Sequence, residues 1–304
     1  MKVLILIVTY NGSKFIKECL HSINFSTINT EVLIIDNCSN DRSIEIIKDD
    51  FPYVELICNN KNLGFGKANN IGIKYAIENN YEYVFFLNQD TILEPNAIEK
   101  LLDQANKIKD FGFISPLHLS WSGDALEPIF EYFLRRSGPK NLLSNFFFKN
   151  ESCIEIGFVN AAAWLIPVDT LKKIGGFNPI FPHYCEDIDF YNRLKFFEYK
   201  NYLILDSKIR HYSTGAITIS QRWNTKVKRE VFETIAKLTN INSSFIYSLF
   251  IVIFNSFKKS LIYLLKLKLN EYYFEVIVWF KLLPFLFEVI SVRNKSKKGN
   301  AFLK

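Results

Sequence analysis

Between residues 1 and about 115, short apolar runs alternate with segments in which apolar residues recur every three or four positions. Because the runs are apolar at successive positions, they predict strands buried on both faces, and the spaced segments predict amphipathic helices. The predicted strands cover residues 3–8, 32–35, 54–57, 84–87 and 113–114. Five alternations of strand and helix predict an α/β fold, with a parallel sheet that binds ligands at the carboxyl ends of its strands.

The first helix is predicted to begin at Ser13 as an N-cap, with Ile16, Leu20 and Ile23 on one face. The period is lost over 120–155, where Gly, Pro, Asn and Ser gather, which indicates a long connection or a mobile flap. A strand is predicted over 156–166, and the pattern beyond about 220 is helical and rich in aromatic residues. The remaining predicted helices cover 42–49, 67–79, 95–108, 168–174 and 187–197.

With 304 residues, 49% of them hydrophobic, the chain can bury the core of one large domain or two smaller ones. Its net charge of +6 is uneven, because residues 221–304 carry 15 Lys and Arg against 5 acids. A basic segment interleaved with aromatic residues is typical of contact with an anionic membrane surface, where each cation contributes about 1 kcal/mol. Nucleic acid is the competing partner for such a segment, and we expect the membrane surface and no nucleic acid.

No segment is expected to span a membrane. The apolar stretches 249–254 and 276–280 are interrupted by Lys258, Lys259, Lys281 and Pro284, short of the roughly 20 residues that a spanning helix needs. The run 3–8 ends without a small-residue cleavage site, which favours a buried strand over a signal peptide. Five cysteines with no CxxC pair argue against a disulfide framework or a zinc site and fit a reducing cytoplasm.

Polar residues follow the first two predicted strands. Thr9, Tyr10 and Asn11 end the first strand, and Asp36 ends the second. A carboxylate only accepts hydrogen bonds, so Asp36 is suited to the N3–H of a uracil or thymine ring, with helix capping as the alternative. For Asp41, which lies just before the next helix, capping is the favoured role.

The third strand leads into a glycine-containing loop, 59–70, that runs into a helix and includes Asn62, Gly64 and Lys67. Backbone amides at a helix start attract anions, so this loop and Lys67 are candidates to face a diphosphate. The spacing of Gly64 and Gly66 matches neither a dinucleotide-binding fingerprint nor a P-loop, which argues against dehydrogenases and kinases.

The fourth strand ends at Asn88, Gln89 and Asp90. A carboxylate at the mouth of a parallel sheet, beside a diphosphate, is suited to Mg²⁺ or Mn²⁺, which commonly share oxygen ligands between one or two carboxylates and substrate phosphates. Asp90 lies too far before the helix predicted from Pro95 to cap it. We therefore predict a metal ligand at Asp90.

Three carboxylates, Glu186, Asp187 and Asp189, fall within four positions at a predicted helix start. This is more than capping requires, although capping by all three is the alternative. Asp187 is the candidate base that deprotonates an acceptor hydroxyl. His211 follows a predicted strand and is a candidate neighbour of the diphosphate or metal, while a lone histidine is more often structural.

Taken together, these residues resemble glycosyltransferase family 2, within it most closely the rhamnosyltransferase-like branch, over roughly residues 1–215. The motifs that carry the resemblance are Val8-Thr9-Tyr10-Asn11, Asp36-Asn37-Cys38-Ser39-Asn40-Asp41, Asn62-Leu63-Gly64-Phe65-Gly66, Leu87-Asn88-Gln89-Asp90-Thr91, Gly175-Gly176-Phe177 and Glu186-Asp187-Ile188-Asp189.

The resemblance implies the GT-A fold of nucleotide-diphospho-sugar transferases, a mostly parallel sheet flanked by helices, here with a helical C-terminal extension. It also implies an inverting single displacement from a cytoplasmic donor. By position, Asp36 matches the base-binding acid, Asp90 the last acid of a DxD-type metal motif, Asp187 the catalytic base and His211 the late histidine near the metal. Asn88 replaces the first acid of that motif, which removes one metal-binding carboxylate.

The leading hypothesis is a catalytic domain over 1–219, with a nucleotide-binding half (1–115) and an acceptor half (116–219), followed by a basic aromatic tail (220–304). It would move rhamnose or a hexose from a dTDP- or UDP-sugar to a glycan or lipid-linked acceptor, with Mn²⁺ or Mg²⁺, peripherally at the inner face of the plasma membrane. The tail would contact the membrane or form a homodimer. The expected site residues are Thr9, Tyr10, Asn11, Asp36, Asn62, Gly64, Lys67, Asn88 and Gln89 for the donor, Asp90 and His211 for the metal, and Asp187 with Glu186 for catalysis.

Two other classes compete with this hypothesis. A catalytically inert nucleotide-sugar-binding or scaffold subunit is disfavoured, because a decayed enzyme should have lost at least one of Asp36, Asp90 and Asp187. A glycoside hydrolase would leave the nucleotide-binding features without a purpose.

Overall fold

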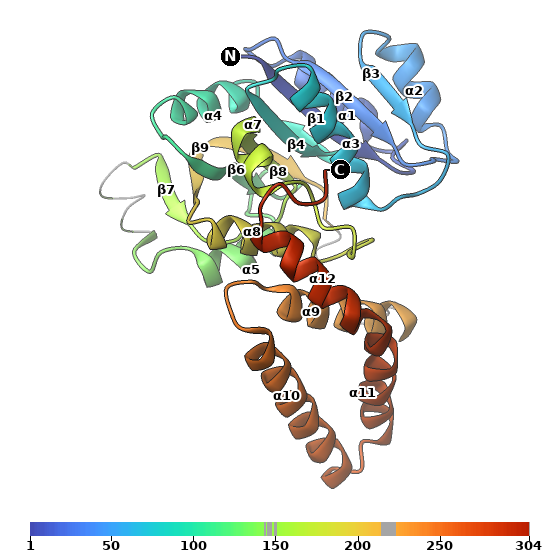
Figure 1. The fold of residues 1–304 in the computed structure, drawn as a ribbon. Coiled ribbons are helices and arrows are strands. Elements are labelled where there is room, and N and C mark those ends of the chain that lie inside the picture. Colours follow the sequence, from blue (N-terminus) through green and yellow to red (C-terminus); the bar gives the residue numbers. More distant parts are fainter. Residues whose placement is uncertain (143, 145–147, 149–150, 214–222, 304) are drawn as a thin grey trace.

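The computed structural model describes residues 1–142, 144, 148, 151–213 and 223–303. In the first part of the chain, strands and helices alternate as the apolar pattern predicts, and each predicted strand forms (Figure 1). The elements are β1 (Val3–Thr9), α1 (Ile16–Asn24), β2 (Glu31–Asp36), α2 (Ser43–Asp50), β3 (Glu55–Cys58), α3 (Phe65–Glu78) and β4 (Tyr83–Asn88).

The second part of the chain adds strands to the same sheet, and some of them run parallel and others antiparallel to their neighbours. Its elements are β5 (Thr91–Leu93), α4 (Ala97–Ala105), β6 (Phe111–Leu119), α5 (Pro128–Ser137), β7 (Cys153–Ile156), β8 (Ala163–Pro167), α7 (Val168–Ile174), α8 (Glu186–Phe196) and β9 (Lys200–His211). The C-terminal elements are α9 (Trp223–Thr239), α10 (Phe245–Leu265), α11 (Leu269–Leu282), the 3₁₀ turn η1 (Leu283–Phe285) and α12 (Leu286–Lys297).

The strand order is β3-β2-β1-β4-β8-β6-β9-β5, with β7 also paired to β9. β1 to β4 are parallel, whereas β8 runs antiparallel to β4 and β6. The fifth predicted strand, now β6, is therefore separated from β4 by β8, so the sheet is mixed and mostly parallel. Alternation of elements predicts their type, but it does not fix which strands become neighbours.

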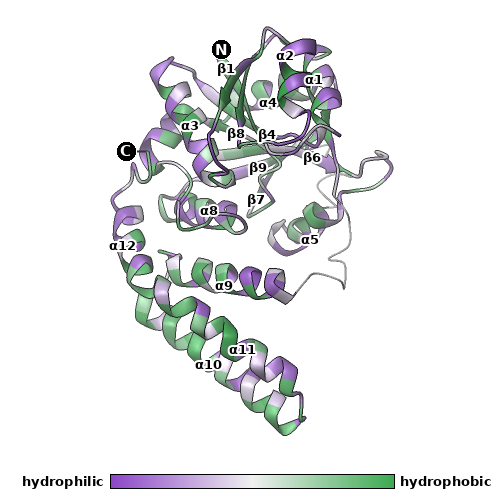
Figure 2. Ribbon diagram, turned by 90° about the vertical axis from the view of Figure 1, so that its right-hand side faces the viewer, coloured by the Kyte–Doolittle hydropathy of each residue, from purple (hydrophilic) through white to green (hydrophobic). Residues whose placement is uncertain are grey.

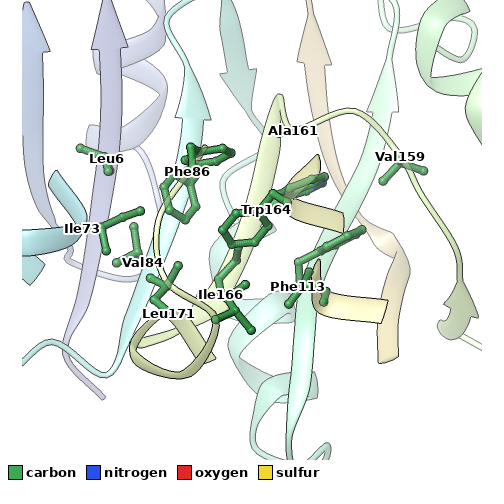
Figure 3. Close-up of a cluster of buried hydrophobic side chains, with 14 of the residues drawn as sticks. Leu6, Ile73, Val84, Phe86, Phe113, Val159, Ala161, Trp164, Ile166 and Leu171 are labelled. Carbon is green, nitrogen blue, oxygen red and sulfur yellow. The ribbon is translucent and has the colours of Figure 1, made fainter. Parts of the chain in front are cut away.

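Successive side chains of the central strands point to opposite faces of the sheet, and both faces are covered. Leu4 and Leu6 of β1 belong to one buried cluster, and Ile5 and Ile7 to the other. Figure 3 shows the first cluster, where Trp164 of β8 lies among Phe86, Phe113 and Ile166, and the stacked rings of Phe113 and Trp164 have centroids 4.3 Å apart. Burial on both faces explains why the strand runs are apolar without interruption.

Three local predictions are wrong. α1 begins at Ile16 and Ser13 makes no capping contact, because the turn closes instead through hydrogen bonds from the amides of Phe15 and Ile16 to the carbonyl of Gly12. The segment predicted as one strand over 156–166 is two strands, β7 and β8, joined by an irregular stretch in the site described below. The connection 120–155 contains α5, which starts where the buried Glu127 caps the amides of Ile129 and Phe130; part of this segment lies outside the described residues.

The C-terminal helices pack on the sheet domain through α9, which contacts α8. A buried cluster joins Ile180, Phe181 and Cys185, near the start of α8, to Val231 and Ile235 of α9. The chain end returns to the sheet domain, where the carbonyl of Phe302 accepts a hydrogen bond from Asn70 Nδ2. In contrast, α10 and α11 form a hairpin that projects away from the sheet (Figures 1 and 2).

α10 corrects the expectation that no helix is long enough to cross a membrane. It has 21 residues, a mean hydropathy of 1.5 over its most apolar window, and only 11% of that window is buried. From the sequence, Lys258 and Lys259 were expected to end the apolar stretch, but the helix continues through both residues. By length and composition alone, α10 meets the minimum for a spanning helix.

Candidate active site

A pocket of about 740 Å³ opens at the carboxyl ends of β1 and β4. The strand register places Val8 beside Asn88 and Thr9 beside Asp36, so the polar residues that end three strands meet at one edge. The loop before α3 and the start of α8 also line it. The predicted site residues that line it are Tyr10, Asn62, Gly64, Asn88, Gln89, Asp90, Glu186 and Asp187.

Gln89 ties the end of β4 to the end of β1. Its Oε1 accepts hydrogen bonds from Thr9 Oγ1 (2.6 Å) and the Tyr10 amide (3.1 Å), and its Nε2 donates to the Tyr10 carbonyl (3.3 Å). The side chain of Thr9 is fully buried and used in this link, whereas Tyr10 is 45% exposed. Of the residues that end β1, Tyr10 is therefore the one with a ring free to contact a ligand.

Asn11 and Asp36 do not line this pocket. Asn11 has a left-handed backbone (φ 49°), and its Oδ1 accepts a hydrogen bond from the Asn40 amide at 2.9 Å. Asp36 is fully buried; its Oδ2 accepts a hydrogen bond from the Ser39 amide at 2.9 Å, while its Oδ1 has no partner. A buried acceptor without a partner is costly in a finished fold, which marks Asp36 Oδ1 as an atom with an unmet hydrogen bond.

Asp41 organises the start of α2. Its carboxylate accepts hydrogen bonds from the amides of Ser13 (2.9 Å) and Ser43 (3.0 Å). Partial burial opposes ionisation, but a hydrogen bond from the Ser43 hydroxyl, together with those from the two amides, outweighs it and lowers the pKa of Asp41 to about 2. This contact fits the capping role expected for Asp41.

The loop before α3 is held against the start of the α8 segment. Asn62 Oδ1 accepts hydrogen bonds from Asn37 Nδ2 (2.9 Å) and the Gly64 amide (2.8 Å). Gly64 has φ of 82°, and a Cβ there would lie 2.0 Å from the Pro182 carbonyl oxygen. Only glycine permits both this backbone and this approach.

Lys67 is not in this pocket. It lies on α3 beside a separate cavity of about 660 Å³, which it lines together with Lys74, Lys295 and Lys298. The loop turns the start of α3 toward the pocket through Gly64 and Phe65, and Lys67 falls on another side of the helix.

Asp90, which lines the pocket, contacts His211, which does not. Asp90 Oδ1 and His211 Nε2 are 3.5 Å apart, and Asn88 Nδ2 is also 3.5 Å from His211 Nε2. The pairing of Thr91 with His211 in adjacent strands brings them together, although 120 residues separate Thr91 and His211 in the chain. His211 is 7% exposed, and its Nδ1 has no partner.

Asp90 and His211 form part of a ligand set that fits a divalent cation. Within the ranges that the structure describes, no group of three or more His, Cys, Asp and Glu side chains is arranged to hold a metal. Mg²⁺ and Mn²⁺ accept such sites when substrate phosphates and water complete the coordination. A cation here would therefore depend on the diphosphate as well as on Asp90 and His211.

The three acids of α8 separate into two roles. Asp189 Oδ2 forms a buried ion pair with Arg193 Nε at 3.0 Å, and its Oδ1 accepts from Asn178 Nδ2. Arg193 also donates to the carbonyls of Ile174 and Gly176, so this network is structural. Glu186 and Asp187 face the pocket instead.

The backbone that presents these two acids is strained. Tyr184 and Cys185, the two residues before α8, both have left-handed conformations (φ 74° and 68°). Such non-glycine conformations persist where surrounding structure holds them, and they concentrate at functional sites. The strained turn aims the first residues of α8 at the ends of β1 and β4.

Glu186 and Asp187 differ in how firmly they hold a proton. Burial raises the pKa of Glu186, and the neighbouring charge of Asp187 raises it further; Glu186 Oε2 has no partner. Burial also raises the pKa of Asp187, to about 6, while hydrogen bonds from the amides of Ile188 and Ala161 favour its ionised form. Near neutral pH, Asp187 is thus the carboxylate that ionises first.

Sequence reasoning did not identify Lys228 and His183 as pocket residues. His183 precedes the strained turn, and burial beside Lys228 lowers its pKa. Lys228 lies on α9, in the region interpreted only by composition, and reaches the pocket because Val227 and Val231 bury against the segment before α8. No motif signals this contact, which exists only through tertiary packing.

Comparison with known proteins agrees with this geometry. The model of glycosyl transferase family 2 matches residues 4–166. An N-acetylglucosaminyl-diphospho-decaprenol L-rhamnosyltransferase of Mycobacterium tuberculosis is 25% identical over 233 residues, covering 68% of this chain and 76% of its own. The dTDP-rhamnosyl transferase RfbF of Shigella flexneri is 38% identical over 76 residues, 24% of each chain.

Other relatives match only in part. The glycosyltransferase SunS of Bacillus subtilis is 31% identical over 120 residues, and the match spans 38% of this chain and 27% of SunS. Among solved structures, S. aureus TarS 1-349 in complex with UDP has a TM-score of 0.54 at 16% identity, over 82% of this chain and 68% of that one. GalNAc-T7 with UDP, GalNAc and Mn²⁺ also reaches 0.54 at 16% identity, over 79% and 50%.

The structural likeness establishes the fold, which is GT-A as the sequence motifs predicted. The family match covers more than half of the chain and includes β1, β2 and β4, whose ends form the pocket. The chain therefore belongs to glycosyl transferase family 2.

Proposed function

We propose that this chain is an inverting glycosyltransferase that takes a sugar from a nucleoside-diphosphate donor bound in the 740 Å³ pocket. The observation that carries the proposal is that Asp90 and Asp187, which are far apart in the sequence, line the same pocket. Asp90 comes from the end of β4, where a diphosphate and its cation are proposed to sit, and Asp187 comes from the start of α8.

The donor is proposed to be a dTDP- or UDP-sugar carrying rhamnose or a hexose. The M. tuberculosis and S. flexneri relatives support a rhamnosyl donor, since both are named as rhamnosyltransferases. The pyrimidine would lie near the ends of β1 and β2, where Tyr10 is exposed for stacking. Asp36 would take the base imide only after its buried Oδ1 becomes accessible, since no part of Asp36 is exposed.

Asp187 is proposed as the general base. Its carboxylate takes the proton of the acceptor hydroxyl while the hydroxyl oxygen bonds to the anomeric carbon. The bond from that carbon to the diphosphate oxygen breaks, and its electron pair leaves with the nucleoside diphosphate. Glu186, which holds its proton more tightly, would instead donate a hydrogen bond into the pocket from the same turn of α8.

Two positive charges are proposed to stabilise the leaving diphosphate. Asp90 and His211 would hold Mn²⁺ or Mg²⁺, which supplies Lewis-acid neutralisation of the phosphate charge when bound. Lys228 lines the same pocket from α9 and forms no ion pair within the described part of the chain, so it remains available to the diphosphate. Asn88 leaves the cation with one carboxylate ligand fewer. The positive charge of Lys228 would supply part of the neutralisation of the diphosphate that a more weakly held cation provides less of.

The acceptor is proposed to be a growing surface polysaccharide or a lipid-linked glycan. The M. tuberculosis relative supports this, because its name specifies a diphospho-decaprenol acceptor. Residues 220–304 would then keep the enzyme peripherally at the inner face of the plasma membrane, as a basic segment rich in exposed apolar side chains suits an interface. A homodimer through the same region is the competing arrangement.

The test is a transfer assay with dTDP-rhamnose, UDP-glucose, UDP-galactose and UDP-N-acetylglucosamine against lipid-linked glycan acceptors. The expected result is transfer from one donor, with a product whose anomeric configuration, read by NMR, is opposite to that of the donor. Donor binding without transfer to any acceptor would favour the inert nucleotide-sugar-binding subunit. The presence of both Asp90 and Asp187 argues against that alternative.

A further inference from the structure

The outer half of the α10–α11 hairpin carries ten exposed large apolar side chains, at 253, 254, 257, 261, 262, 264, 265, 267, 269 and 273. From residue 253 to 274, which includes the turn between the helices, no side chain is buried. Exposed fractions reach 77% at Leu265, 83% at Leu267 and 64% at Leu269. Figure 2 shows this hairpin as mostly hydrophobic along its length and clear of the sheet domain. Apolar surface of this extent normally marks an interaction site.

The hairpin is anchored at its base, so its exposure is not a sign of a loosely attached segment. Lys259 of α10 pairs with Glu230 of α9 (3.1 Å) and with the buried Glu275 of α11 (3.4 Å). Ser256 accepts a hydrogen bond from Trp279 Nε1 at 2.6 Å and donates one to Glu275. These contacts fix the hairpin to α9 as far out as Lys259, and Tyr273 stacks on Trp223 of α9, whereas residues 261–272 form no side-chain hydrogen bond or ion pair within the ranges that the structure describes.

Cations alternate with leucines at the tip. The sequence Leu265-Lys266-Leu267-Lys268-Leu269 crosses the turn between the helices, and Lys258 lies further up α10. Lys258, Lys266 and Lys268 form no ion pair within the ranges that the structure describes, and Glu271 is the single acid between residues 253 and 274. Lysine stems can lie along apolar surface with the ammonium group in the headgroup layer.

We infer that the tip of the α10–α11 hairpin, residues 261–272, inserts into the interfacial layer of an anionic lipid bilayer. The inference gives the proposed peripheral membrane contact a defined element and depth. The leucines at the tip lie at the boundary between headgroups and acyl chains, and Lys258, Lys266 and Lys268 face the anionic headgroups. An interfacial element of this kind combines buried apolar area with cations.

The depth follows from the lengths and charges of the two helices. Although α10 reaches about 31 Å, the 14 residues of α11 extend only about 21 Å, less than the roughly 30 Å of the hydrocarbon layer. A full crossing would also carry Lys266 and Lys268 through that layer. Shallow insertion keeps both lysines at the surface.

A second copy of the chain fits this surface less well than lipid does. On α10, exposed apolar side chains occur at 246, 247, 250, 253, 254, 257, 261, 262, 264 and 265, which together span about half of the helix circumference. A pairing helix covers a narrower stripe, whereas lipid contacts every direction. The unpaired lysines at the tip would also repel their copies in a symmetric dimer.

The test is flotation of the full chain with vesicles of phosphatidylcholine alone and of phosphatidylcholine mixed with phosphatidylglycerol. The wild type is expected to float with the anionic vesicles at least tenfold more than with the neutral ones. The variant Leu265→Ser/Leu267→Ser/Leu269→Ser is expected to lose at least tenfold of that binding, and Lys266→Gln/Lys268→Gln to lose the preference for anionic lipid. The control Phe25→Ser/Tyr53→Ser removes two exposed aromatic rings elsewhere and should float like the wild type.

Depth is read from a tryptophan at the tip. Leu267→Trp fluorescence should be quenched by brominated acyl chains, while Phe25→Trp fluorescence should not. Equal flotation of the wild type and the triple serine variant, or a wild type that stays off anionic vesicles and sediments as a dimer that the serine variant breaks, would overturn the inference. Nucleotide binding, measured on the same samples, reports the proposed function separately: a chain that binds UDP but no vesicles refutes the membrane contact alone.

Discussion

At the residue scale, the proposed transfer mechanism depends on the difference between Glu186 and Asp187, which are adjacent carboxyl groups in unlike environments. The unpartnered Glu186 retains a proton to higher pH, and Asp187, supported by two backbone amides, ionises first. The proposed transfer needs one group that takes the proton of the acceptor hydroxyl, and Asp187 is the carboxylate proposed for that step.

Replacement of Asp187 by Asn is expected to reduce transfer by about 100-fold to 10,000-fold, because it removes the group that takes the proton. Affinity for the nucleoside diphosphate should stay within a few-fold of wild type. Steady-state rates and nucleotide titrations on the same preparation provide the measurement, and Asp169→Asn, an exposed change on α7, is the control. A transfer rate close to wild type would remove Asp187 as the base.

The raised pKa of Glu186 predicts how stability depends on pH. Its folded-state pKa lies above its ordinary value of 4.5, so the native state binds more protons than the unfolded chain once pH exceeds that value. The contribution of Glu186 to stability is therefore complete below pH 4.5 and is lost as pH rises through its raised pKa. Urea unfolding across this range should give a declining free energy for wild type and a flatter profile for Glu186→Gln; parallel profiles would contradict the assignment.

At the element scale, the site is built from contacts between segments that the sequence keeps apart. The loop before α3 touches the segment before α8 at Gly64 and Pro182, and α9 brings Lys228 to the same pocket. The strand ends supply polar groups, but these loops and helices give the pocket its walls.

Gly64→Ala tests the first of these contacts. A Cβ at this position meets the Pro182 carbonyl and the backbone has positive φ, so we expect a loss of about 1–3 kcal/mol in unfolding free energy and weaker nucleotide binding. Gly123→Ala is the matched control, because it has nearly the same φ but its Cβ would meet only the side chain of Arg210, at 3.0 Å. If both variants lose the same stability and neither loses nucleotide affinity, the loop contact has no role in the site.

Lys228→Met tests the second contact. Affinity for UDP or dTDP should fall by about tenfold, while affinity for uridine or thymidine stays constant, because the lysine is proposed to face the diphosphate and not the base. Lys226→Met, two positions away on α9 and outside the pocket, is the control. An equal loss for nucleoside and nucleoside diphosphate would show a structural role for Lys228.

The sequence predicted the elements well where burial alone decides them. The strands that form β1, β2 and β4 were predicted because continuous apolar runs require burial on both faces, whereas β3, at the edge of the sheet, is only partly buried. The irregular segment between β7 and β8 was not, because Phe158 and Val159 are buried like strand residues while the backbone turns toward the pocket. Tertiary packing, which the local pattern does not contain, decides such cases.

At the scale of the whole molecule, the sheet domain and the C-terminal helices pack together through α8 and α9. Motifs predicted Tyr10, Asn62, Asn88, Asp90 and Asp187, all of which line one pocket. Lys228 and the projecting hairpin were beyond prediction, since both depend on how α9 packs against α8. The proposed boundary between residues 219 and 220 lies outside the described residues.

The most direct test of the central claim is a thermal-shift measurement of nucleotide binding to the wild type and to Asp90→Asn. A ligand that binds only the native state raises its melting temperature. We predict that UDP or dTDP with Mn²⁺ or Mg²⁺ stabilises the wild type more than GDP, CDP or ADP does, and that EDTA or Asp90→Asn reduces the shift. The absence of a response to any nucleoside diphosphate would contradict the account.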